Sequence, residues 1–294
     1  MGSAPARFRK LKTYLQLGRV SNIPTVWTNV LAGLVLAGGQ VTVSPFLILA
    51  LSLSCSYIGG MFLNDAFDRE HDRQVRPERP IPSGAASAQE VLAIGFGLLA
   101  AGFLVLLSFV HEGGWQLVAA GVMLVLLIIF YDLHHKQNPW SPLTMAGCRA
   151  MIYPIAAFSL APVLPTSVLI GAAALFTYVL GVSFLARFET APRPGPWWPL
   201  VLLWGPFAIA LPGATGSLET VLLMVGVSGW LGYLTWQTIR TEGPKVRQVT
   251  GLWLAGISLL DTCLIAGLGQ FKLAMYSAIG YFLANSLQRS IRGS

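Results

Sequence analysis

Long hydrophobic runs recur along the whole chain, separated by short polar segments. Most are close to the roughly 20 residues that an α-helix needs to cross the hydrocarbon core of a bilayer. They lie at 22–39, 44–63, 91–110, 114–131, 143–162, 167–185, 197–211, 219–236 and 249–268, with a shorter tenth run at 273–287. The pattern predicts an all-α polytopic membrane protein with nine or ten transmembrane helices. Because the runs leave no room for a separate water-soluble domain, residues 1–294 are expected to form one domain.

Composition supports this class. Hydrophobic residues make up 54% of the chain and charged residues 11%, and the mean hydropathy is +0.65. A soluble domain typically carries about 25% charged residues. The three cysteines lie in separate apolar runs without a metal-type spacing, so we expect them to be small buried hydrophobic residues. No apolar stretch with a cleavage site follows the basic N-terminus, so a removable signal peptide is not expected.

Positive charges fall in alternate loops. Lys and Arg precede the first run and follow the second, fourth, sixth and eighth, whereas segments 38–43, 111–114, 162–166 and 212–217 contain neither. The positive-inside rule therefore places the N-terminus and the even-numbered loops in the cytoplasm. We expect an integral protein of a bacterial cytoplasmic membrane. The net charge of +7 reflects this topology, and a nucleic-acid partner is not expected.

The stretch Asn64–Asp72, at the end of the second run, carries a regular acidic pattern. Asp65, Asp68 and Asp72 are spaced i, i+3 and i+7, so a helix would place all three carboxylates on one face. Carboxylates this close repel each other unless a cation lies between them. Asn64 adds a neutral oxygen, and oxygen-only ligands suit Mg²⁺ held together with substrate phosphates. The motif predicts a Mg²⁺–diphosphate site at the membrane surface.

Basic residues follow this motif directly. The segment Arg76–Gly84 contains three prolines, which disfavour a helix and favour an ordered, extended loop. Arg76 and Arg79 could then reach phosphate oxygens with forked, charge-assisted hydrogen bonds. The alternative is a solvated loop whose arginines only obey the positive-inside rule. The three aligned carboxylates next to the loop favour the phosphate interpretation.

A second polar cluster, Tyr131–Pro139, closes the fourth run on the same predicted side. His134 and His135 suggest a transition-metal site, but adjacent residues point about 100° apart on a helix, and no third His or Cys is nearby. We favour Lys136 as a phosphate contact and Asp132 as an accessory acid. A polar cap at the membrane edge is the alternative.

Ionisable side chains inside apolar runs are costly unless they are paired or line a wet cavity. Arg149 lies near the start of the fifth run and could bind a phosphate in the same cavity as the aspartates. Glu189 ends the sixth run. Asp261 lies in the middle of the ninth, where we expect a structural pairing with a buried Arg or polar group. Aromatic rings could stabilise a carbocation, and the candidates are Tyr57, Tyr131, Tyr153 and Phe188.

Together these residues resemble a known family. Asn64–Asp72, continued by Arg76–Pro80, is similar to the NDxxDxxxD and RPxRP signatures of the UbiA superfamily of intramembrane prenyltransferases. Asn22–Thr25 resembles the family's entry segment, and the resemblance covers nearly the whole chain. It implies a helical bundle around a central cavity open to the cytoplasmic side. In that cavity Mg²⁺ would hold an isoprenoid diphosphate, with the prenyl tail running toward the bilayer.

The chain departs from the family's pattern after the sixth run. Usual members carry several aspartates there that hold another Mg²⁺, whereas Ser183–Arg193 keeps only Glu189 and adds two arginines. An arginine can neutralise diphosphate charge where a second metal otherwise would. The stretch His134–Pro142, followed by Gly147–Arg149, resembles an EboC-like branch.

The leading hypothesis is a Mg²⁺-dependent prenyltransferase that ionises an isoprenoid diphosphate and passes the prenyl group to a small aromatic or lipophilic acceptor. In this hypothesis the metal is held by Asn64, Asp65, Asp68 and Asp72, and the diphosphate is bound by Arg76, Arg79, Lys136 and Arg149. The proton of the acceptor would be removed by Glu189 or Asp132. A membrane terpene cyclase is the first alternative, raised by the altered second motif. A catalytically silent protein that binds or moves a lipophilic metabolite is the second. An ion-coupled transporter, suggested by charges within the spans, is the third.

Overall fold

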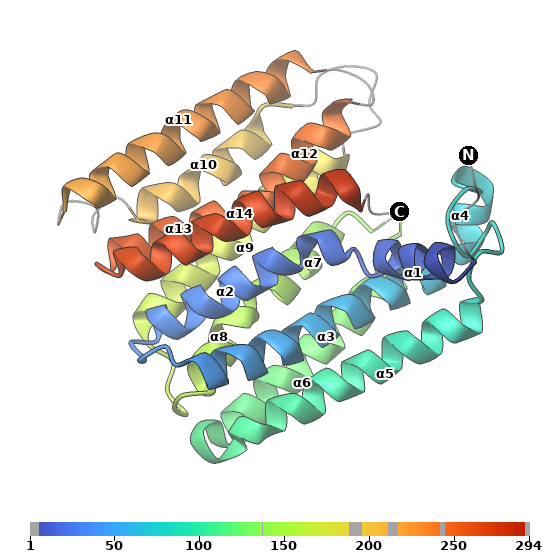
Figure 1. Cartoon of the computed structure of the whole chain (residues 1–294), viewed down its shortest axis with the longest axis horizontal. Coiled ribbons are helices and arrows are strands. Elements are labelled where there is room, and N and C mark those ends of the chain that lie inside the picture. The colour runs from blue at the N-terminus through green and yellow to red at the C-terminus, as the bar shows by residue number, and fades with distance from the viewer. Residues whose placement is uncertain (1–5, 137, 188–195, 211–216, 242–244, 292–294) are drawn as a thin grey trace.

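The protein is helical throughout the part that the structure describes, which is residues 6–136, 138–187, 196–210, 217–241 and 245–291 of a computed structural model (Figure 1). No strand occurs within those residues. In chain order the helices are α1 (Ala6–Leu17), η1 (Val20–Asn22), α2 (Ile23–Leu36), α3 (Val43–Phe67), α4 (Arg69–Val75), α5 (Ala88–Leu106), η2 (Leu107–Phe109), α6 (Val110–His134), α7 (Ser141–Ala150), α8 (Ile152–Phe158), α9 (Thr166–Arg187), α10 (Trp198–Ala210), α11 (Leu218–Arg240), α12 (Lys245–Ala255), α13 (Ile257–Gly267) and α14 (Phe271–Ser290). The all-α prediction is confirmed.

Helix α2 joins the two halves of the bundle. It packs against α3 and α8 on one side and against α13 and α14 on the other, as Figure 1 shows. Thirteen of its fourteen residues are buried, which suits a helix that is apolar all round. Val30 and Leu34 enter the core formed with α3, α5 and α6, whereas Leu31 and Val35 enter the core formed with α9 to α14.

Two of the predicted spans are broken helices. The fifth run divides into α7 and α8 at Met151, three residues before Pro154, which lacks the N–H that would bond the carbonyl oxygen four residues earlier. The ninth run divides into α12 and α13 at Gly256. There the Tyr178 hydroxyl donates a 2.7 Å hydrogen bond to the Trp253 carbonyl oxygen. A Cβ at Gly256 would lie 2.3 Å from that hydroxyl, so only glycine fits this approach.

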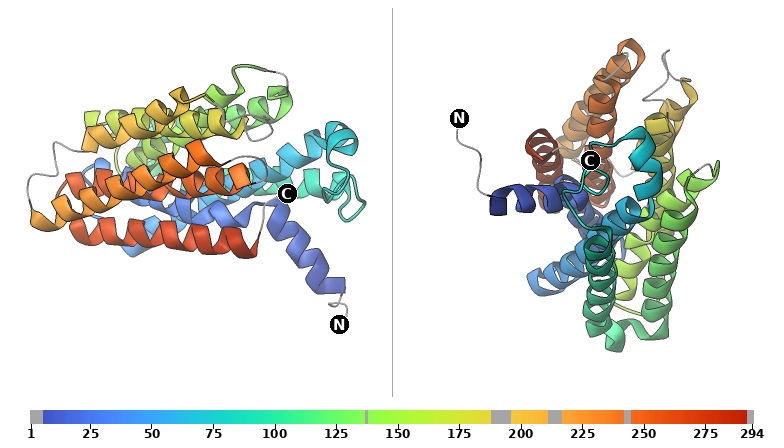
Figure 2. Two further views of the ribbon diagram at one scale, coloured as in Figure 1. Left: turned by 90° about the horizontal axis from the view of Figure 1, so that it is seen from above. Right: turned by 90° about the vertical axis from the view of Figure 1, so that its right-hand side faces the viewer.

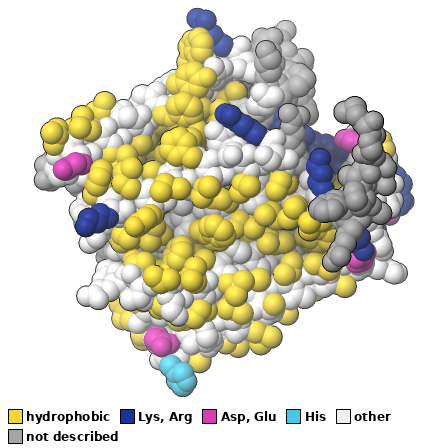
Figure 3. Space-filling model, viewed as in Figure 1, with side chains coloured by type: hydrophobic (Ala, Val, Ile, Leu, Met, Phe, Trp, Pro, Cys, Tyr) yellow, Lys and Arg dark blue, Asp and Glu magenta, His cyan; other side chains and the backbone are white. Residues whose placement is uncertain are grey.

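Several helices have the dimensions of membrane spans. Within the described residues, five helical segments are long and apolar enough to cross a bilayer: Val43–Phe67, Ala88–His134, Thr166–Arg187, Leu218–Arg240 and Val246–Gly267. The predicted count of nine or ten spans stays a prediction. Large hydrophobic side chains such as Leu104, Leu222 and Phe282 are 61–67% exposed on the outside of the bundle. Figure 3 shows one face on which hydrophobic side chains are spread widely over the surface and most charged side chains lie near the edges.

The acidic end of α3 is covered by a short cap. Helix α4 follows α3 after Asp68, and the left view in Figure 2 shows it beyond the end of the bundle. The proline-rich segment after α4 forms consecutive turns, with backbone hydrogen bonds from Ser83 to Arg79 and from Ala86 to Pro80. The prediction that this segment is an extended loop is therefore wrong. The turns fold the chain back so that Arg79 returns to the acidic helix end.

Candidate active site

The four oxygen ligands predicted from the acidic motif lie on one buried side of the α3–α4 junction. Asn64, Asp65, Asp68 and Asp72 are only 2–5% exposed, whereas the α4 residues between Asp68 and Asp72 are half-buried or exposed. The helical hydrogen bonds continue across the junction, with Asp68 N–H bonded to Asn64 O at 3.0 Å and Asp72 N–H to Asp68 O at 2.9 Å. The expectation that one helical face carries all three carboxylates is confirmed.

Arginines neutralise two of these carboxylates. Arg79 Nη1 donates to Asp72 Oδ2 at 2.6 Å and lies 3.6 Å from Asp65 Oδ1. Arg19 Nη2 lies 3.6 Å from the same Asp65 oxygen. Because Arg79 is itself only 9% exposed, these groups form a largely desolvated charge cluster, in which electrostatic interactions are stronger than in water.

The third carboxylate is neutralised by the two residues that follow α6. Lys136 Nζ lies 3.0 Å from Asp68 Oδ2, and His135 Nε2 lies 3.2 Å from the same oxygen. The His135 ring stacks on Tyr131, with ring centres 4.8 Å apart. Burial alone would raise the pKa of Asp68, but the interactions with His135 and Lys136 outweigh it and hold that pKa below its ordinary value. Asp68 is therefore ionised at neutral pH.

Asp132 joins the site through an amide. Asn64 Nδ2 donates to Asp132 Oδ1 at 3.3 Å, which links α3 to α6 beneath the charged cluster. The other oxygen, Asp132 Oδ2, is buried and has no hydrogen-bond partner within the described part of the chain. A buried acceptor without a partner is costly, so this oxygen is suited to receive a donor or a cation.

Arg19 is the residue of this site that sequence reasoning missed. The charge pattern identified it only as one of the N-terminal basic residues. It adopts a left-handed backbone conformation, with φ 43° and ψ 44°, which a residue with a Cβ rarely takes. Such strain is concentrated at functional sites. The turn between α1 and η1 directs the Arg19 side chain to Asp65, which lies 46 positions later in the sequence and shares no local pattern with it.

The donor set fits Mg²⁺ bound together with a phosphate. Among the described residues, no group of three His, Cys, Asp or Glu side chains is arranged to hold a metal by itself. Mg²⁺ seldom needs such a cage, because it keeps several waters and takes one or two carboxylates together with substrate phosphates. Asn64, Asp65, Asp68 and Asp72 offer hard oxygens, and the free oxygen of Asp132 lies next to them.

Arg149 and two of the predicted aromatic residues form a separate group deeper in the bundle. Arg149 Nε donates to Asn29 Oδ1 at 2.6 Å, and its guanidinium carbon lies 5.8 Å from the centre of the Tyr57 ring. The Tyr153 hydroxyl donates to Asp261. The expectation that Asp261 has a buried polar partner is thereby confirmed. None of these contacts joins Arg149 to the aspartates of the α3–α4 junction, and its role in binding a phosphate stays a prediction.

The remaining predicted residues lie at the rim or outside the described residues. Arg76 directly follows α4 as its C-cap residue and is exposed. Phe188 and Glu189 lie outside the part that the structure describes. Arg187 donates to the carbonyl oxygens of Asn138 at 2.8 Å and Pro139 at 3.2 Å, so it fixes the loop between α6 and α7.

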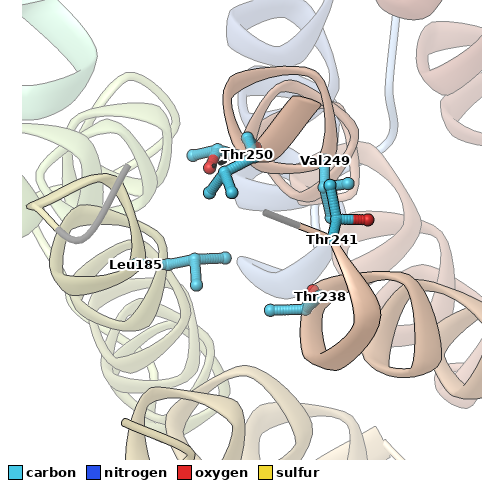
Figure 4. A pocket seen from close by; sticks show the side chains of 6 residues that line it. Leu185, Thr238, Thr241, Val249 and Thr250 are labelled. Carbon is cyan, nitrogen blue, oxygen red and sulfur yellow. Dashed lines mark hydrogen bonds between the residues drawn. The ribbon is translucent and has the colours of Figure 1, made fainter. Parts of the chain in front are cut away.

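A small hollow elsewhere in the bundle differs in character. Figure 4 shows it between α9, α11 and α12, and it has room for about one water molecule. Among the described residues no charged side chain lines it; the lining residues are Leu185, Thr238, Thr241, Val246, Val249 and Thr250. It is too small and too neutral for a diphosphate.

Known proteins share both the fold and part of the sequence. One solved structure comes from work on digeranylgeranylglyceryl phosphate synthase in membranes. It superimposes on 90% of this chain and 99% of its own chain, with a TM-score of 0.61 and 19% sequence identity. A UbiA homologue from Archaeoglobus fulgidus, solved bound to GPP and Mg²⁺, matches 88% of this chain and 99% of its own, with a TM-score of 0.60 and 15% identity. At these identities the likeness shows the fold.

Sequence similarity to curated relatives is confined to part of the chain. A digeranylgeranylglyceryl phosphate synthase from Ignicoccus hospitalis is 41% identical over 93 residues, which is 32% of this chain and 30% of the relative. One from Metallosphaera sedula is 30% identical over 142 residues, 48% of this chain and 49% of the relative. The matched part thus spans less than half the length of these relatives.

The family itself is shown by a longer match. The model of the UbiA prenyltransferase family matches residues 25–260, which include the acidic motif, the α6–α7 loop and Arg149. The chain therefore belongs to the UbiA prenyltransferase family, and the predicted classes, a membrane protein and a prenyl-transferring enzyme, are confirmed at the level of the family.

Proposed function

We propose that this chain is a single-domain, Mg²⁺-dependent prenyltransferase that ionises an isoprenoid diphosphate at the α3–α4 junction. The observation that carries the proposal is the pairing of buried oxygens with cations. Asp65, Asp68 and Asp72 are almost inaccessible, yet each lies within 3.6 Å of a basic side chain. Groups that are expensive to bury persist where they bind or react. A site with both hard oxygens and cations suits a metal–diphosphate pair.

The reaction breaks the bond between the first prenyl carbon and the diphosphate oxygen, and its electron pair leaves with the diphosphate. Mg²⁺ bound to Asn64, Asp65, Asp68 and Asp72 would supply Lewis-acid stabilisation of that charge. Arg76, Arg79, Lys136 and Arg19 would add donors around the leaving group, and positioned cations lower the barrier for developing negative charge. For this to happen, Arg79 and Lys136 exchange a carboxylate partner for a phosphate oxygen.

The acceptor then attacks the allylic cation with a lone pair or, if it is aromatic, with a π electron pair of its ring, and loses a proton. Tyr131 lies beside the charged cluster through its stacking on His135, and Tyr57 lies farther along α3, so both rings are candidates to stabilise the cation. Asp132, with its unpartnered oxygen, is our candidate to take the acceptor proton, and Glu189 stays the second candidate. The acceptor is a small aromatic or lipophilic molecule.

We further propose that the site and the N-terminus face the cytoplasm, around a central cavity open to that side. The support is the charge asymmetry of the loops. The relatives reported above are archaeal, and a bacterial membrane for this chain stays a prediction.

The test is diphosphate release by the purified protein in detergent. Geranyl, farnesyl and geranylgeranyl diphosphates are supplied with Mg²⁺ and without an acceptor, and the organic products are analysed. Release with prenyl alcohols supports a transferase awaiting its acceptor. A cyclic hydrocarbon would replace the transferase with a terpene cyclase. If no chain length is bound or cleaved, a binding or transport role takes the place of catalysis.

A further inference from the structure

The acidic motif turns its oxygens to two sides. Asp65 and Asp72 lie beside Arg79, whose Nη1 is 3.6 Å from an oxygen of the first and 2.6 Å from an oxygen of the second. Asn64 and Asp68 instead contact side chains at and just after the end of α6. The motif therefore has an Arg79 side and an α6 side.

Three oxygens on the α6 side have no hydrogen-bond or ion-pair partner among the residues that the structure describes. Asn64 Nδ2 donates to Asp132 Oδ1, and the Asn64 Oδ1 atom is unused. The contacts of Asp68 with His135 and Lys136 both end at Oδ2, so its Oδ1 is unused. Asp132 Oδ2 is buried and also unused. Each of these three ligand residues thus keeps one oxygen for a cation.

Asp132 also differs from the motif carboxylates in its charge balance. Within the described ranges, no nitrogen of Lys, Arg or His lies within 4.0 Å of an Asp132 oxygen, whereas all three motif carboxylates have such a neighbour. Asp132 is only 3% exposed, and Asp68 is close enough for its negative charge to act on it. Carboxylates that are both buried and close together repel each other unless a cation lies between them. The α6 side therefore has room in its charge balance for a cation.

We propose that Asn64, Asp68 and Asp132 form a Mg²⁺ position of their own between α3 and α6, which we call the α6 metal position. It rests on the proposed function, because the diphosphate and water supply the remaining oxygens. Two carboxylates and one amide suit Mg²⁺ in that setting. Asp132 is then a metal ligand from outside the acidic motif, contributed by a helix 68 positions later in the chain than its partner Asn64.

The α6 metal position changes the division of labour in the site. Asp65 and Asp72, on the Arg79 side, remain available for a further Mg²⁺, so that ions on both sides of the motif would clamp one diphosphate. A carboxylate oxygen that holds a cation is a weaker base, because the cation stabilises its charged form. Asp132 is therefore committed to the metal, and the proton of the acceptor passes to Glu189, the second candidate.

The experiment counts bound metal by equilibrium dialysis of the full chain in detergent. The probes are Mn²⁺, which shares the octahedral oxygen coordination of Mg²⁺, and inorganic pyrophosphate. The excess manganese on the protein side is measured by mass spectrometry. Wild type is expected to bind about two ions per chain and Asp132→Asn about one, since the variant loses a carboxylate ligand of one position.

Two controls address general charge and folding. Glu112→Gln removes an exposed carboxylate from the first turn of the same helix and should keep the wild-type manganese count. Asp132→Asn keeps an oxygen that can accept from Asn64 and removes a buried charge without an ion-pair partner. It should therefore be at least as stable as wild type towards SDS unfolding in EDTA.

The outcomes separate the α6 metal position from the proposed function. A single ion per wild-type chain overturns the position, whether or not the variants fold, and leaves the proposed function standing. An unchanged count in Asp132→Asn also overturns it and returns Asp132 to the proton of the acceptor. Lower stability of Asp132→Asn in EDTA would mean that other groups already balance this carboxylate, which contradicts the charge argument. No manganese on wild type with pyrophosphate would overturn the proposed function and the position together.

Discussion

Replacing Arg79 with methionine is expected to destabilise the acidic end of the bundle by about 3 kcal/mol in the absence of Mg²⁺. Arg79 Nη1 lies 2.6 Å from Asp72 Oδ2, and the two side chains are 10% and 3% exposed. Breaking a buried pair by removing one partner costs roughly 3–5 kcal/mol. We take the lower end, because Arg79 keeps some contact with water and because Asp65 retains Arg19 at 3.6 Å.

The assay is unfolding by SDS in mixed micelles, followed by far-ultraviolet circular dichroism with EDTA present. Adding Asp72→Asn to the Arg79→Met variant removes the stranded charge and should recover at least about half of the lost free energy of unfolding. Arg73→Met is the matched control, because Arg73 forms an exposed pair with Glu70, and such pairs contribute about 0–1 kcal/mol. The reasoning is refuted if the double variant is no more stable than Arg79→Met alone.

Three other predictions follow from single contacts. Lys136→Met should raise the low pKa of Asp68 toward its ordinary value. A carboxyl group whose pKa is lower in the folded than in the unfolded state stabilises the folded state above the unfolded-state pKa, and this stability is lost as the pH falls through the folded-state pKa. The variant should therefore be less stable than wild type at pH 7 and equally stable in strong acid, as measured by the same unfolding assay. Gly256→Ala should lower the midpoint of thermal unfolding, because its Cβ would meet the Tyr178 hydroxyl at 2.3 Å, and Tyr178→Phe in the same chain should restore part of the loss; no recovery would place the strain elsewhere. Tyr131→Phe should keep diphosphate release near wild type whereas Tyr131→Leu should lower it at least about tenfold, since only the ring face matters for a cation; equal loss in both would assign the effect to the hydroxyl.

The sequence predicts those features whose signals are local. The apolar runs anticipate the helices, since a helix that crosses lipid has to satisfy its backbone internally over a fixed length. The acidic face is predictable for the same reason, because the spacing of Asp65, Asp68 and Asp72 is itself a helical period. Their burial on one side of the α3–α4 junction confirms that part of the prediction.

Features that depend on tertiary contacts could not be predicted from local sequence patterns. The break at Gly256 depends on Tyr178, which approaches from a different helix. Arg19 reaches Asp65 through a strained turn with no counterpart in the spacing of charges. The partners of Arg149, Asn29 and Thr25, come from α2, more than a hundred positions earlier in the chain, and periodicity along one helix does not contain that information.

The most direct measurement of the central claim is Mg²⁺-dependent diphosphate release from geranylgeranyl diphosphate by two variants only two residues apart. Asp68 is buried and faces Lys136, whereas Glu70 is exposed on the opposite side of the same helix junction. Asp68→Asn should lower release at least about 10²-fold with unchanged folding, and Glu70→Gln should leave it unchanged. Equal rates in wild type and Asp68→Asn would contradict the assignment of the metal–diphosphate site.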